Sequence, residues 1–110
     1  MNLRISEQAL RWRVTRAEVD LLLSGRAVKL HVALPRAHSF QAVVRVSAIQ
    51  GWQLDSDPTG IWLTVPRAEL QALAESLPRK EPIEHVMDVD GRELRLSFEV
   101  DVRERGNRSA

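Results

Sequence analysis

Two stretches of this chain repeat nearly the same pattern. Residues 10–19 read LRWRVTRAEV, and residues 61–70 read IWLTVPRAEL. In each stretch an alternating apolar run leads into Arg-Ala-Glu, which is typical of a helix start. Repetition at a fixed period usually means that one supersecondary unit occurs twice. We therefore expect two similar halves, residues 1–50 and 51–103, followed by a frayed tail at 104–110.

The first half begins with a predicted hairpin. Apolar residues alternate with polar ones over residues 2–6 and 10–14, which indicates half-buried strands. A two-residue turn at Glu7-Gln8 sets Ile5 opposite Leu10 and Arg4 opposite Arg11, with every apolar residue on one face. Thr15 and Glu18 then form a capping box, so a helix should begin there. Alternation over residues 28–34 and 40–48 predicts two further strands.

The second half follows the same order. Residues 52–54 and 61–65 alternate as strands around the loop DSDPTG, and Pro66 stands where a helix start tolerates proline. Pro78 should stop that helix. Alternation then resumes over residues 83–89 and 94–102, joined by Asp90-Gly91, which is a strong two-residue hairpin signal.

Each half thus reads strand–strand–helix–strand–strand, and neither covers its own apolar faces. The halves should therefore share one core as a single α+β domain, residues 1–110. We expect one antiparallel-rich sheet of about eight strands, strongly twisted or barrel-like, with two helices packed against it. Closure or dimerisation would hide the sheet edges.

Composition narrows the function classes. The chain is 44% hydrophobic and 28% charged, with a formal net charge of +1, which is ordinary for a soluble globular protein. A nucleic-acid binder normally has a clear basic excess, so that partner is disfavoured. There is no cysteine, no signal-peptide pattern at the start and no apolar run long enough for a membrane span. These features predict a cytoplasmic protein with no membrane partner.

An arginine face is the best candidate site. Arg4, Arg11 and Arg13 share the polar side of the first hairpin, and Arg16 follows just beyond. Arg4 and Arg11 repel when directly opposite, so an acidic group should cover them. Glu99 and Asp101 on the last strand are the internal candidates. The other interpretation is a bound anion, either a phosphate or a partner's carboxylates.

Acidic and histidine residues give weaker signals. The loop Asp55–Gly60 contains Asp-x-Asp-x-Thr, but Asp, Ser, Pro and Gly are also ordinary turn residues. Asp88, Asp90 and Glu93 cluster at the other hairpin as a weak metal candidate or as solvated turn acids. His85 falls on the inward face opposite Leu96, where a hydrogen bond to a backbone carbonyl would satisfy it. We predict neither a metal site nor a cofactor.

Apolar residues on the polar faces suggest an interface. Four of them point away from the inward residues of their strands: Val43, Ile49, Trp62 and Val86. Such residues indicate that the face is covered, either by a second copy of the chain or within one chain.

The opening of the chain resembles a family of small bacterial proteins classed as a domain of unknown function. The residues that carry the resemblance are Met1, Leu3, Arg4, Arg11, Arg13, Val14, Thr15 and Glu18. The resemblance implies no substrate, cofactor or catalytic residue.

Two functions remain open. One is a small non-catalytic interaction or regulatory module that self-associates as a homodimer. The other is a barrel-like protein that binds a small anion or nucleotide at its arginine face and hydrolyses a phosphate ester. The residues favour a role other than catalysis, because no nucleophile–base pair can be identified in them.

Overall fold

The computed structural model describes residues 1–48, 51–78 and 81–101. Its first part has strand β1 (Asn2–Ser6), strand β2 (Ala9–Thr15), helix α1 (Arg16–Leu23), strand β3 (Val28–Ala33), the 3-10 turn η1 (Pro35–Ala37) and strand β4 (Ser39–Ser47). Its second part has strand β5 (Gln53–Asp57), strand β6 (Gly60–Pro66), helix α2 (Arg67–Glu75), strand β7 (Ile83–Val89) and strand β8 (Arg92–Asp101). The predicted tail, residues 104–110, lies outside the described residues.

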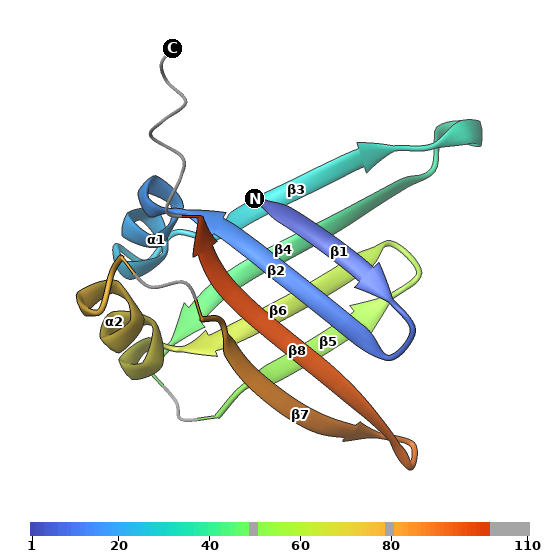
Figure 1. The fold of residues 1–110 in the computed structure, drawn as a ribbon. Helices are drawn as coiled ribbons and strands as arrows, with labels where there is room; N and C mark the ends of the chain where they lie inside the picture. Colours follow the sequence, from blue (N-terminus) through green and yellow to red (C-terminus); the bar gives the residue numbers. More distant parts are fainter. Residues whose placement is uncertain (49–50, 79–80, 102–110) are drawn as a thin grey trace.

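The strands form two sheets, which corrects the expectation of one barrel-like sheet. Sheet A has the order β1-β2-β8-β7, and sheet B has the order β3-β4-β6-β5 (Figure 1). Both are open and mixed, because β2 runs parallel to β8 and β4 runs parallel to β6 while the outer pairs are antiparallel. Alternation in a sequence identifies the buried face of a strand, but it does not identify the neighbouring strand. Barrel closure was therefore a wrong prediction.

Within the hairpins, the predicted registers are confirmed. Arg4 lies opposite Arg11 and Ile5 opposite Leu10. In the last hairpin, His85 lies opposite Leu96. The turn there uses Asp90 and Gly91 with φ of 51° and 85°, the left-handed conformation that a two-residue turn of this type requires.

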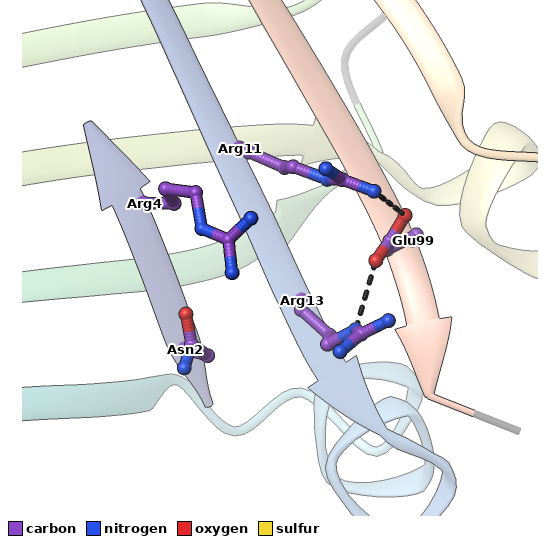
Figure 2. A pocket seen from close by; sticks show the side chains of 5 residues that line it. All are labelled: Asn2, Arg4, Arg11, Arg13 and Glu99. Atoms are coloured by element: carbon purple, nitrogen blue, oxygen red, sulfur yellow. Dashed lines mark hydrogen bonds and ion pairs between the residues drawn. The ribbon is translucent and has the colours of Figure 1, made fainter. Parts of the chain in front are cut away.

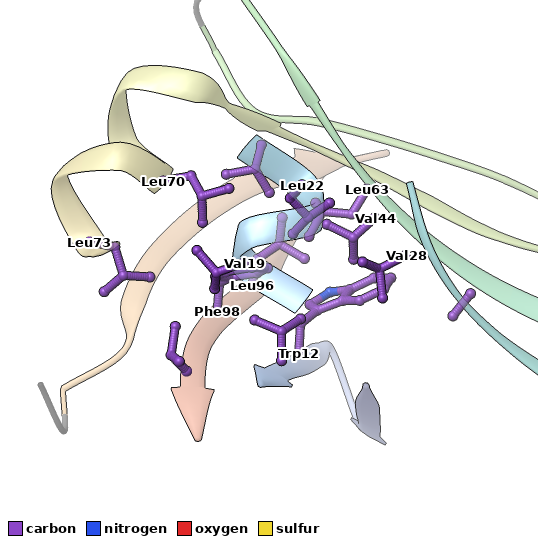
Figure 3. Packing of buried hydrophobic residues seen from close by; sticks show 14 of the residues in the cluster. Trp12, Val19, Leu22, Val28, Val44, Leu63, Leu70, Leu73, Leu96 and Phe98 are labelled. Carbon is purple, nitrogen blue, oxygen red and sulfur yellow. The ribbon is translucent and has the colours of Figure 1, made fainter. Parts of the chain in front are cut away.

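The core lies between the two sheets and is closed at one end by the helices (Figures 1 and 3). Sheet A contributes Trp12, which is fully buried and paired with Phe98 on β8. Sheet B contributes Val44, paired with Leu63. The helices complete the cluster with four buried residues: Val19, Leu22, Leu70 and Leu73. Residues from two sheets and two helices thus share one apolar interior.

Trp12 carries one unpaired group into this core. Its Nε1–H is buried and has no hydrogen-bond partner among the described residues. Leaving such a donor unpaired costs about 1–3 kcal/mol. Burial of an indole removes up to about 250 Å² of surface from water and contributes about 6 kcal/mol to the stability of the fold, which exceeds the cost of the unpaired donor.

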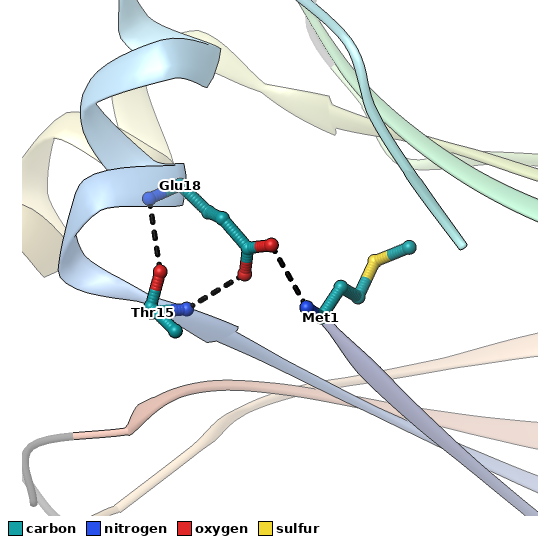
Figure 4. A network of polar contacts seen from close by, with 3 residues as sticks. All are labelled: Met1, Thr15 and Glu18. Atoms are coloured by element: carbon teal, nitrogen blue, oxygen red, sulfur yellow. Dashed lines mark hydrogen bonds and ion pairs between the residues drawn. The ribbon is translucent and has the colours of Figure 1, made fainter. Parts of the chain in front are cut away.

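Helix α1 begins at the predicted capping box. The backbone N–H of Glu18 donates to Thr15 Oγ1 at 3.1 Å, and the backbone N–H of Thr15 donates to Glu18 Oε1 at 2.9 Å (Figure 4). The second carboxylate oxygen of Glu18 accepts from the α-amino group of Met1 at 2.8 Å. Glu18 therefore ties the start of β1 to the start of α1. Helix α2 has Pro66 at its N-cap instead, and it begins at Arg67.

We expect Thr15→Ala to lower the free energy of unfolding by about 1 kcal/mol, because the backbone N–H of Glu18 loses its acceptor. Urea unfolding followed by tryptophan fluorescence measures the change. Ser56→Ala, at an exposed strand position, should leave stability within about 0.5 kcal/mol of the parent protein. Equal stability of the two variants would show that the cap contributes nothing.

Gly60 is required where β4 and β6 approach each other. A Cβ added there would clash with the backbone oxygen of Gln41, its register partner. Backbone atoms of a central strand cannot move aside as the end of a flexible side chain can.

Gly60→Ala should therefore destabilise the fold by about 1–3 kcal/mol through overpacking. The midpoint of thermal unfolding measures this, with Ser56→Ala again as the matched single-site control. An unchanged midpoint would mean that the two strands separate at no cost.

Candidate anion-binding site

The candidate site lies on the outer face of sheet A. Because Trp12 and Phe98 point inward, their neighbours along β2 and β8 point outward. The parallel register then sets Arg11 beside Ser97 and Arg13 beside Glu99. A polar face three to four strands wide results.

Two adjoining depressions occupy this face. The smaller has a volume of about 100 Å³, and its lining residues are Asn2, Arg4, Arg11, Arg13 and Glu99 (Figure 2). The larger has a volume of about 350 Å³, and its lining residues are Arg4, Ser6, Ala9, Leu10, Arg11, Pro82, Glu84, Arg95 and Ser97. Arg4 and Arg11 line both, so the two depressions form one groove, here called the arginine groove. Its larger part lies at the lower end of the size range of small-molecule pockets.

One carboxylate serves two of the arginines. Glu99 Oε2 accepts from Arg13 Nε at 2.8 Å, and Glu99 Oε1 accepts from Arg11 at 3.3 Å (Figure 2). The Glu99 side chain is 9% exposed, whereas those of Arg11 and Arg13 are 51% and 40% exposed. The predicted pairing of the arginine face with Glu99 is thus confirmed. The two hydrogen bonds hold both guanidinium groups beside Glu99 in the lining of the groove.

Positive charge exceeds negative charge along the groove. Its described lining contains Arg4, Arg11, Arg13 and Arg95 against the carboxylates of Glu84 and Glu99. The structure gives Arg4 no hydrogen-bond or ion-pair partner among the described residues, and its guanidinium extends over β2 (Figure 2). Guanidinium groups gathered in a hollow favour an anion that accepts from several of them at once.

Four arginines line the groove, and the sequence predicted three of them: Arg4, Arg11 and Arg13. Arg16, the fourth one predicted, begins α1 and lines neither depression. Arg95, which does line the groove, was missed. The alternation of β8 places Arg95 on the polar face, but only the parallel pairing of β2 with β8 brings it beside Ala9.

The equivalent face of sheet B carries different side chains. By register, Trp62 stands beside Val43 where sheet A has Arg11 beside Ser97. Thr64 stands beside Arg45 where sheet A has Arg13 beside Glu99, and Arg45 Nε donates to Thr64 Oγ1 at 3.3 Å. Val43 is only 5% exposed. On sheet A, by contrast, the larger depression is lined in part by three small residues, Ser6, Ala9 and Ser97.

The four predicted interface residues have different surroundings. Val43 is buried within one chain, Trp62 beside it is half-buried, and Val86 is 49% exposed. Ile49 lies outside the described residues. Of these four, only Val86 is shown as an exposed apolar side chain.

The acidic turns and His85 have structural partners. Thr59 donates its backbone N–H and its hydroxyl to Asp57 Oδ1 at 2.7 and 2.6 Å, and these bonds hold the pKa of Asp57 below its ordinary value. Asp88 accepts from the backbone N–H of Gly91. His85 stacks on the indole of Trp52 with 5.5 Å between ring centroids, a contact that sequence reasoning missed. Among the described residues, no three His, Asp or Glu side chains gather as metal ligands.

A family model matches residues 1–104 of this chain, and its description is a family of unknown function, DUF7009. The chain belongs to this family. Membership confirms the resemblance to a domain of unknown function that the opening residues indicated. The DUF7009 chain matches no curated protein. Among its described residues, no helix is both long and apolar enough to cross a membrane.

Glu99→Gln should lower the free energy of unfolding by about 1–3 kcal/mol at low salt, because the arginines lose their shared carboxylate and repel one another. Urea unfolding in a low-salt buffer measures the loss. Added sulfate should recover part of it, since an anion can take the place of the carboxylate. Glu84→Gln is the matched control and should change stability by less than about 0.5 kcal/mol. Equal losses in both variants would contradict this account of Glu99.

Proposed function

We propose that this chain is a binding module that holds an anionic ligand in the arginine groove. The supporting observation is the hollow itself, in which four arginines face two carboxylates. One of those carboxylates, Glu99, is already engaged by Arg11 and Arg13. Arg4 and Arg95, from β1 and β8, then supply guanidinium groups to a ligand.

The ligand class follows from the groove. Arg4 and Arg95 stand two strands apart, so a ligand with two separated anionic oxygens, such as a diphosphate, contacts both. Glu84 at the far side accepts a hydrogen bond from a ligand N–H or O–H. A mononucleotide combines these groups in a volume suited to the larger depression.

Binding, without hydrolysis, is the proposed role. Glu99 is held between Arg11 and Arg13, whose hydrogen bonds occupy both of its carboxylate oxygens. A general base must be free to reach the proton that it removes. Glu84 is exposed and is suited to recognising a ligand.

The test is a thermal-shift and calorimetric screen at low salt with inorganic phosphate, pyrophosphate and mononucleotides. We expect binding by at least one of these anions, and we expect Arg4→Ala and Arg95→Ala each to weaken it by about tenfold or more. The matched control is Arg45→Ala on the equivalent face of sheet B, which should leave binding unchanged. Absence of binding by all the anions, or an equal effect of Arg45→Ala, would refute the proposal.

Self-association is the second candidate function. It is supported by exposed apolar side chains on two projecting hairpins, at Val32, Leu34, Val86 and Val89. A homodimer of two copies of the chain would bury them. We place this proposed role in the cytoplasm, on the same sequence grounds as above.

A further inference from the structure

Negative charge is distributed very unevenly along this chain. Residues 21–54 contain no aspartate or glutamate, although they include Arg26, Lys29, Arg36 and Arg45. The hairpin β3–η1–β4, here called the basic arm, is the middle of that segment. Residues 31–39 of the arm are all exposed. Its free end therefore carries basic groups and no carboxylate.

The basic arm also exposes apolar side chains. Val32 and Leu34 are 43% and 44% exposed on an arm that projects from the body of the molecule (Figure 1). At its turn, Arg36 and Ala37 adopt φ of 65° and 62°, the left-handed region that favours glycine. A strained turn that presents two large apolar residues is typical of a contact surface.

The hairpin β7–β8 has the opposite charge. Its end, here called the acidic tip, carries Asp88, Asp90 and Glu93. Arg92 beside them is paired with Glu7 at 3.8 Å. The tip also exposes two apolar side chains, with Val86 at 49% and Val89 at 43%. Basic arm and acidic tip thus match in both charge and apolar character.

Both ends lie on the same side of the molecule. Figure 1 shows the basic arm and the acidic tip at the end away from α1 and α2, well separated from each other and belonging to different sheets. They are too far apart to cover one another within one chain. A two-fold axis at this end would bring the arm of each chain onto the tip of the other, so the same contact would form twice and the assembly would close.

We propose that a second copy of this chain is the partner of these hairpins, and that the basic arm of each copy packs against the acidic tip of the other in a homodimer. Apolar contact of Val32 and Leu34 with Val86, which shares one face of the hairpin with Asp88 and Glu93, supplies the affinity, and the charges set the orientation. This inference rests on the self-association hypothesis and is independent of the arginine groove.

The first measurement is the mass of the full chain by light scattering over a range of concentrations at low and high salt. We expect a dimer at low salt that dissociates more readily as salt is added, because the opposite charges are screened. A monomer under all conditions would overturn both this inference and the self-association hypothesis.

Charge-reversal variants then test whether the arm and the tip form the dimer contact. Arg36→Glu on the arm and Asp90→Arg on the tip should each raise the dissociation constant of the dimer by about tenfold or more. An equimolar mixture of the two variants should form a mixed dimer, because one contact regains opposite charges and the other is unaltered. This recovery also shows that both variants are folded.

The control substitutions reverse charges elsewhere. Arg26 follows α1, and Glu75 is the last residue of α2. Arg26→Glu and Glu75→Lys should therefore leave the mass measured by light scattering unchanged. A dimer that survives both hairpin substitutions would leave self-association standing and would overturn the arm-to-tip contact. The same conclusion would follow if the mixture failed to form mixed dimers.

Discussion

The parallel pairing of β2 with β8 is the interaction on which the rest of the structure depends. It joins a strand near the start of the chain to the last described strand, and its register places Trp12 beside Phe98 in the core. Because side chains alternate across a strand, the same register places Arg13 beside Glu99 on the outer face. If β2 shifted by one residue relative to β8, the indole of Trp12 would be exposed and the arginines would be buried. The same register therefore specifies both the core and the groove.

The two sheets share an arrangement of strands but differ in the side chains on their outer faces. Sheets A and B use the same order of outer, inner, inner and outer strands with a parallel central pair. On sheet B, Trp62 and Val43 cover the central strands, whereas on sheet A Ser97 leaves space beside Arg11. Glu99 keeps two arginines ordered without neutralising the whole face, which leaves the groove open and positive.

The hairpin β7–β8 links the two proposed surfaces. Its base supplies Glu84 and Arg95 to the arginine groove, and its end is the acidic tip. On the inner side of the same hairpin, the indole of Trp52 stacks on His85 and makes an edge contact with Phe98. The Nε1–H of Trp52 donates a hydrogen bond to Glu69 on α2. A second chain that contacts the tip would therefore contact the same hairpin that supplies Glu84 and Arg95 to the groove.

The sequence by itself determined the strands, the helix cap at Thr15 and the hairpin registers, because alternation, capping and two-residue turns are local properties of neighbouring residues. It also identified Arg4, Arg11 and Arg13 as a cluster of arginines and Glu99 as a candidate counter-ion, which pairs with Arg11 and Arg13, since opposed like charges need a counter-ion. Only the tertiary structure decided that the strands divide into two open sheets, that Arg95 joins the groove and that His85 stacks on Trp52. Those outcomes depend on contacts between residues far apart in the chain, and a pattern of buried and exposed positions does not say which strand will lie beside which.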